Sequence, residues 1–109
     1  MAKAEQIMKL SEVLLSAERL LWQLELFLPA DRRWTEDTQG ALLDTEDEED
    51  PDNPEFAKAH SLVCTLGMSQ VQEIISNARQ QELNADIGKL LRAFLFYYEN
   101  DAFIDFDNP

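Results

Sequence analysis

Residues 3–28 read KAEQIMKLSEVLLSAERLLWQLELFL, and no glycine or proline interrupts them. Apolar residues recur in this stretch at steps of three and four, which is the spacing of one helix face. The positions on that face are Ile7, Leu10, Leu14, Ala17, Leu21, Leu24 and Leu28. Leu15, Trp22 and Leu26 widen the apolar face, so Trp22 is expected in the core. The stretch predicts one long amphipathic helix that ends at Pro29.

The chain changes character over residues 29–55, which contain Gly40 and three of the four prolines. Residues 41–43 read ALL and are compatible with a short extended piece. A dense run of like charge, DTEDEEDPDN, follows over residues 44–53. Because such a run repels itself, it predicts an exposed loop. An EF-hand calcium loop is not expected, because its sixth position, counted from Asp44, would require glycine and holds Glu49.

Helical periodicity returns in the second half of the chain. Asn53 is suited to cap a helix over residues 54–66 that ends at Gly67. Ser69 and Gln72 have the spacing of a capping box at the start of the next helix. Asn84 is suited to cap a last helix that reaches about residue 99.

These four predicted helices lead to an all-α fold class. Strand signals are almost absent, so we expect a small four-helix bundle-like domain. Residues 1–109 form this single helical domain, with a long acidic loop (29–55) between helices 1 and 2 and a C-terminal tail (100–109). The surplus apolar surface of the first helix is compatible with a homodimer.

The net charge of −13 is concentrated in two segments of the chain. Residues 29–55 carry −9 and residues 84–109 carry −3, whereas the rest is nearly neutral. A surface this acidic disfavours direct contact with nucleic acid and with anionic membranes, because nothing neutralises their phosphates. It favours a basic protein partner, which a one-signed field attracts and steers.

The sequence indicates a cytoplasmic protein without cofactor or metal. Its only cysteine, Cys64, cannot form an intramolecular disulfide, and charged residues interrupt the apolar positions near the N-terminus. The three glycines cannot build a phosphate-binding loop. His60 and Cys64 are four residues apart on the predicted helix, but a structural zinc site needs about four such ligands. We therefore interpret them as a half-buried histidine and a small core thiol, and expect no enzyme activity.

Aromatic residues beside acidic ones indicate an interaction surface, because aromatic anchors with a charged rim are typical of binding hot spots. Phe103 and Phe106 are instead expected to fix the C-terminal tail on the bundle. The candidate partner-binding residues are Trp34, Asp44, Glu46, Asp47, Glu48, Glu49, Asp50, Tyr97, Tyr98, Glu99 and Asp101.

The ending FYYENDAFIDF, over residues 96–106, together with the early tryptophan and the central acidic loop, resembles certain bacterial immunity proteins. These proteins are encoded beside contact-dependent growth inhibition toxins and related polymorphic toxins. The resemblance implies a protein that binds and blocks a cognate toxin domain, often a nuclease. It implies no particular fold and no inhibitory residue.

Three functions remain open at this point. The first is an inhibitor that covers the basic active site or substrate groove of a toxin nuclease. The second is a regulatory adaptor or small subunit of a larger assembly, in which the acidic loop serves solubility alone. The third, an enzyme or metal protein built on His60, Cys64 and carboxylates, is the least favoured.

Overall fold

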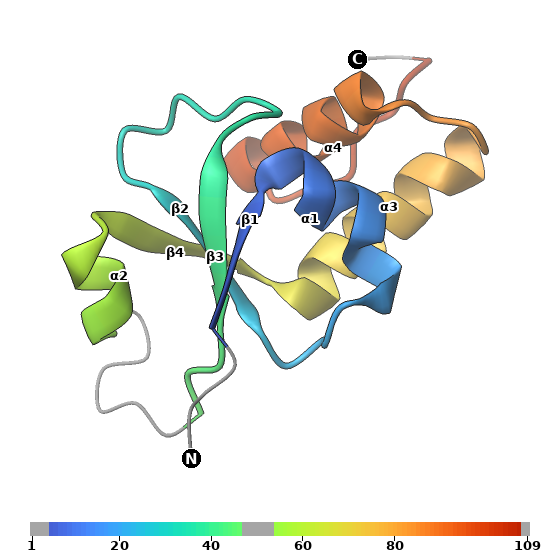
Figure 1. Cartoon of the computed structure of the whole chain (residues 1–109). Helices are drawn as coiled ribbons and strands as arrows, with labels where there is room; N and C mark the ends of the chain where they lie inside the picture. Colours follow the sequence, from blue (N-terminus) through green and yellow to red (C-terminus); the bar gives the residue numbers. More distant parts are fainter. Residues whose placement is uncertain (1–4, 47–53, 108–109) are drawn as a thin grey trace.

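The structure is a computed structural model that describes residues 5–46 and 54–107. It has an α+β fold, in which a four-stranded antiparallel sheet is combined with helices on both faces (Figure 1). The strands are β1 (Glu5–Lys9), β2 (Glu25–Pro29), β3 (Gln39–Leu43) and β4 (Leu62–Gly67). The helices are α1 (Leu10–Ser16), the 3₁₀ turn η1 (Ala17–Arg19), α2 (Glu55–Ala59), α3 (Met68–Gln81) and α4 (Ile87–Asn100). The predicted all-α, four-helix bundle-like class is therefore wrong.

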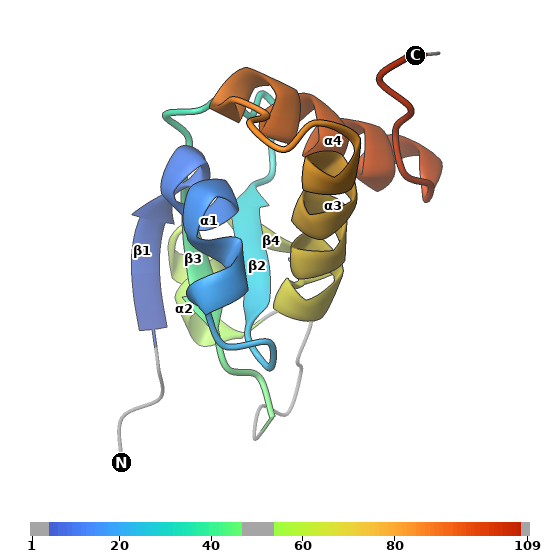
Figure 2. The ribbon, with the colours of Figure 1, turned by 90° about the vertical axis from the view of Figure 1, so that its right-hand side faces the viewer.

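The sheet has the order β1-β3-β2-β4, and its two faces are covered unequally. In Figure 1, α1, α3 and α4 lie on one side of the sheet and the short α2 lies on the other; the rotated view of Figure 2 agrees. We call these the helical face and the α2 face. Leu26, Leu28 and Leu42 point to the helical face, whereas Phe27 and Ala41 point to the α2 face.

The predicted helix over residues 3–28 is wrong because its ends are strands. Only α1 and η1 are helical, and β1 and β2 flank them. β2 is an inner strand, and Leu26, Phe27 and Leu28 are all buried. A strand buried on both faces is a continuous apolar run, which periodicity alone does not separate from a helix.

The other predicted boundaries need smaller corrections. The short extended piece at 41–43 belongs to β3, inside the segment expected to be a loop. The helix expected over 54–66 stops at Ala59, and β4 follows it. The helices expected from Ser69 and Asn84 exist as α3 and α4, but their N-caps are Gly67 and Asp86. The expected cap Asn53 lies outside the described residues.

A bulge in β4 lets that strand serve both faces. Leu26 pairs with Leu66 and Phe27 pairs with Cys64, so Thr65 is the extra residue. Because side chains alternate along a strand, the extra residue turns Leu66 to the helical face while Cys64 stays on the α2 face. The Thr65 hydroxyl donates to the Leu26 carbonyl at 2.7 Å, which fixes the bulge.

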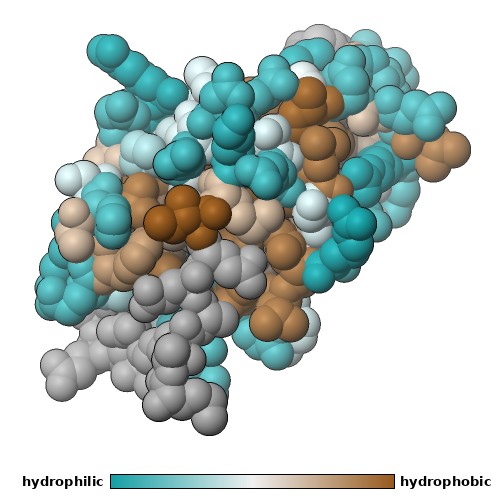
Figure 3. Space-filling view, in the orientation of Figure 1, coloured by the Kyte–Doolittle hydropathy of each residue, from teal (hydrophilic) through white to brown (hydrophobic). Residues whose placement is uncertain are grey.

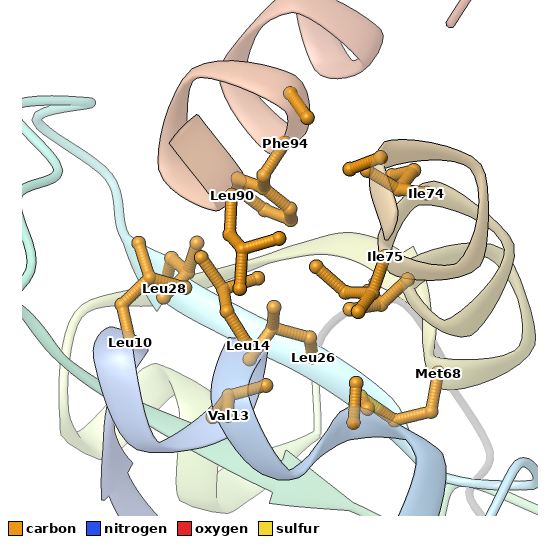
Figure 4. Packing of buried hydrophobic residues seen from close by; sticks show 14 of the residues in the cluster. Leu10, Val13, Leu14, Leu26, Leu28, Met68, Ile74, Ile75, Leu90 and Phe94 are labelled. Atoms are coloured by element: carbon orange, nitrogen blue, oxygen red, sulfur yellow. The ribbon is translucent and has the colours of Figure 1, made fainter. Parts of the chain in front are cut away.

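The main core lies between the sheet and the three helices of the helical face. Figure 4 shows its side chains pointing toward one another from α1, β2, α3 and α4. They include Leu10, Leu14, Leu26, Ile75 and Phe94, each at most 1% exposed. Burial of this much aliphatic surface is the principal stabilisation of the fold.

Candidate functional site

Trp34 is a core residue of the loop between β2 and β3. Its side chain is 7% exposed, and its Nε1–H donates to the Pro29 carbonyl at 2.8 Å. The ring meets Tyr98 of α4 edge-on, with centroids 5.0 Å apart, and lies 6.2 Å from Phe94. A buried indole satisfied in this way holds the loop on α4. Trp34 therefore presents almost no surface to a partner.

The contact between Trp34 and Tyr98 brings the loop before β3, which is the first part of the acidic segment 29–55, next to the C-terminal end of α4. The Arg32 guanidinium lies 5.5 Å from the centroid of the Tyr98 ring, which adds a second link. Glu99 and Asp101 are exposed at the adjacent end of α4. Asp101 adopts the left-handed conformation (φ 54°) and its N–H donates to the Tyr97 carbonyl at 2.7 Å, so it ends the helix.

The acidic run begins at the other end of the sheet. Asp44 directly follows the last residue of β3, whereas the Trp34 loop precedes its first residue. The strand of five residues, about 17 Å long, therefore lies between them. Asp44 is half-buried and accepts from the Glu46 N–H at 3.0 Å, and Glu46 is exposed. Asp47, Glu48, Glu49 and Asp50 lie outside the described residues. The candidate residues therefore form two separate groups.

The C-terminal tail is fixed on the end of α3 by Gln81. Its amide donates to the Ile104 carbonyl at 2.7 Å and accepts from the Phe106 N–H at 3.0 Å. Phe106 packs against the main core, as expected. Phe103 is 45% exposed, with its ring 5.4 Å from that of Tyr97. Phe106 thus anchors the tail, while Phe103 still offers aromatic surface to solvent.

His60 and Cys64 do not share a helix. His60 follows α2, where its exposed ring stacks 4.4 Å from Phe56, and Cys64 lies in β4. The Cys64 thiol is 3.9 Å from a carboxylate oxygen of Glu25. Within residues 5–46 and 54–107, no three His, Cys, Asp or Glu side chains are grouped so as to hold a metal ion.

The exposed surface around Trp22 was not predicted from the sequence. The chain turns between η1 and β2, so that Trp22 is 63% exposed instead of buried, and the expectation of a core role is wrong. Leu21 beside it is 57% exposed. No glycine or proline marks this turn, and the apolar spacing continues through it, which explains the error.

Few of the acidic groups in the described ranges are neutralised by ion pairs within the molecule. The ion pairs among the described residues are Lys9–Asp37, Lys58–Glu55, Arg79–Glu18 and Lys89–Glu82. In this part of the chain, Glu99 and Asp101 pair with no cationic side chain, and neither do Asp105 and Asp107. In the orientation of Figure 1, hydrophilic groups cover much of the surface, and hydrophobic groups gather near the middle, where β1 lies (Figure 3). The exposed charge is therefore available to an external partner.

Fold and surface together define a small α+β protein with a strongly acidic exterior. None of the helices in the described ranges has the length and apolar character needed to cross a membrane. Residues 7–106 match the family model of a domain of unknown function, DUF7716, and the chain belongs to this family. No curated protein and no solved structure gives a significant match.

Proposed function

We propose that this protein is a non-catalytic inhibitor that neutralises a basic toxin nuclease in the cytoplasm, in the manner of an immunity protein. The observation that carries the proposal is the surplus of exposed carboxylates that, within residues 5–46 and 54–107, form no ion pair, in a chain of net charge −13. A domain of this size needs a net charge of magnitude only about 2–8 for solubility. The excess is therefore better explained by a partner of opposite sign.

The charge suits this task because a nuclease attracts phosphates and its substrate groove is correspondingly basic. An acidic protein can cover that groove and repel the nucleic acid that would compete for it. Steering by a one-signed field also accelerates encounter, which matters when a toxin must be captured before it acts. The two acidic groups, at Asp44–Glu46 after β3 and at Glu99–Asp107 from the end of α4 onward, would together attract a basic domain from several directions.

The test begins with the genes beside this chain's own. We expect one of them to encode a basic nuclease toxin domain, which is purified and mixed with the protein. We expect stoichiometric addition of the protein to abolish cleavage of the nucleic acid substrate, and the association rate to fall steeply with salt. Reversing the charges of the Asp44–Asp50 run should slow association about tenfold and flatten its salt dependence. Reversing Glu99, Asp101, Asp105 and Asp107 in a second variant measures the contribution of the other group.

Cleavage that continues at a molar excess of the folded protein would refute the inhibitor role. Recovery of the chain from its host as a stoichiometric subunit of a complex without toxin would instead favour an adaptor. An association rate that neither charge reversal changes would show that the acidic groups do not steer the partner.

A further inference from the structure

A groove follows the solvent-facing side of α3. It consists of two hollows, of about 590 and 280 Å³, that share Glu73 and Ser76 as lining residues. Trp22 lines the first hollow and Phe103 lines the second, so exposed aromatic rings lie at both ends. The helical rise from Ser69 to Gln80 gives the groove a length of about 16 Å.

The exposed Trp22 is held in place by backbone contacts on both sides. Gln72 of α3 donates from its amide to the carbonyls of Ala17, at 2.9 Å, and Leu20, at 2.8 Å. The Met68 N–H donates to the Leu24 carbonyl at 2.8 Å. The turn from η1 to β2 is thus bound to α3 (Figure 2), so the backbone that carries Trp22 loses little entropy when the indole is covered.

Two carboxylates line the same hollow as Trp22. Glu18 accepts from the Arg79 guanidinium at 3.1 Å, so a guanidinium of this chain already lies against one of them. Glu73 is exposed and pairs with no cation among the described residues. The hollow therefore has a flat aromatic ring, a carboxylate available for pairing and the polar groups of Ser69 and Ser76.

We propose that this groove is a docking surface for an arginine-bearing segment of the basic protein partner. The guanidinium stacks on the Trp22 indole and donates to the Glu73 carboxylate, and the segment continues along α3 toward Phe103. Arginine fits better than lysine, because its planar guanidinium can stack on an aromatic face and at the same time donate two N–H hydrogen bonds to a carboxylate. The inference rests on the proposed function for the identity of the partner, but it locates contact along α3, on a surface that meets an acidic group only at Phe103.

Titration of the isotope-labelled protein with a hexa-arginine peptide, followed by NMR, tests the groove directly. We expect saturable shifts of the Trp22 indole N–H and of the Glu73 and Ser76 amides, with the buried Trp34 indole unchanged as an internal control. Trp22→Ala and Glu73→Gln should each weaken binding about threefold or more. Glu36→Gln removes one exposed charge outside the groove and outside both acidic groups, and it should leave the shifts of Trp22 in place. Both substituted groove residues are exposed, so the fold should tolerate their replacement.

Shifts confined to the two acidic groups would overturn the groove assignment, and so would equal affinity for hexa-lysine. The toxin assay separates this inference from the function itself. Inhibition that is unaffected by Trp22→Ala and Glu73→Gln would overturn the groove and leave the inhibitor role standing. Peptide binding at Trp22 without inhibition of the toxin would retain the groove and refute the inhibitor role.

Discussion

The two faces of the sheet differ in how much buried apolar surface they contribute to the stability of the fold. The cluster on the helical face contains eighteen buried residues, most of them from the sheet and three helices, whereas the cluster on the α2 face contains four. Because stabilisation by burial grows with the apolar area removed from water, the helical face carries most of it in the described part of the chain. α3 and α4 contribute a large share of this buried core and also present the groove and the acidic end of the protein.

Two phenylalanines, one packed on each face of the sheet, measure this difference in stabilisation. Their replacement gives the largest expected change in the free energy of unfolding. Phe94→Ala empties a fully buried position on α4 and should lower the free energy of unfolding by about 4 kcal/mol. Phe56→Ala removes a half-buried ring on α2 and should cost about 1 kcal/mol. Equilibrium unfolding in urea of both variants gives the two values. Equal losses would mean that the two faces contribute alike.

Gly40 tests how closely β3 approaches its neighbour β2. A Cβ at this position would lie 2.7 Å from both Leu28 Cδ2 and the Phe27 carbonyl oxygen. Since the backbone oxygen cannot swing aside, Gly40→Ala should destabilise the protein by about 2 kcal/mol.

Gly88, in the first turn of α4, provides the control. Its added Cβ would meet only Asp86 Oδ1, at 3.4 Å, so Gly88→Ala should be neutral or stabilise the helix by at most about 1 kcal/mol. Thermal unfolding of both variants is sufficient to distinguish them. A Gly40→Ala protein as stable as the parent would show that the strands separate readily at this point.

The same contrast explains which elements the sequence could predict. α3 and α4 each bury one face of a long periodic segment, and Val71, Ile74 and Ile75 mark that face unambiguously. β2 is covered on both faces, so its period-two signal disappears. β1 continues directly into α1 at Lys9–Leu10 without a glycine or proline to mark the change.

The candidate site was predictable in its charge but not in its aromatic residues. Net charge and its concentration are properties of composition, and the exposed Glu99 and Asp101 agree with that expectation. The exposure of a tryptophan depends on tertiary packing. Trp34 sits in a polar loop and is buried against Tyr98, whereas Trp22 follows an apolar helix face and is exposed.

Substitutions of Asp86 should give the smallest expected changes in stability. They distinguish the contribution of its capping hydrogen bond from that of its charge at the start of α4. Its carboxylate accepts from the Lys89 N–H at 3.0 Å, which satisfies one of the free donors of the first turn. Asp86→Ala should cost about 1 kcal/mol, because both the acceptor and the charge near the positive helix end are lost. Asp86→Asn keeps the acceptor and should cost only about 0.3 kcal/mol at low salt. If the two variants lose the same stability in urea, the charge rather than the hydrogen bond sets the contribution of this cap, and α4 would then weaken with rising salt.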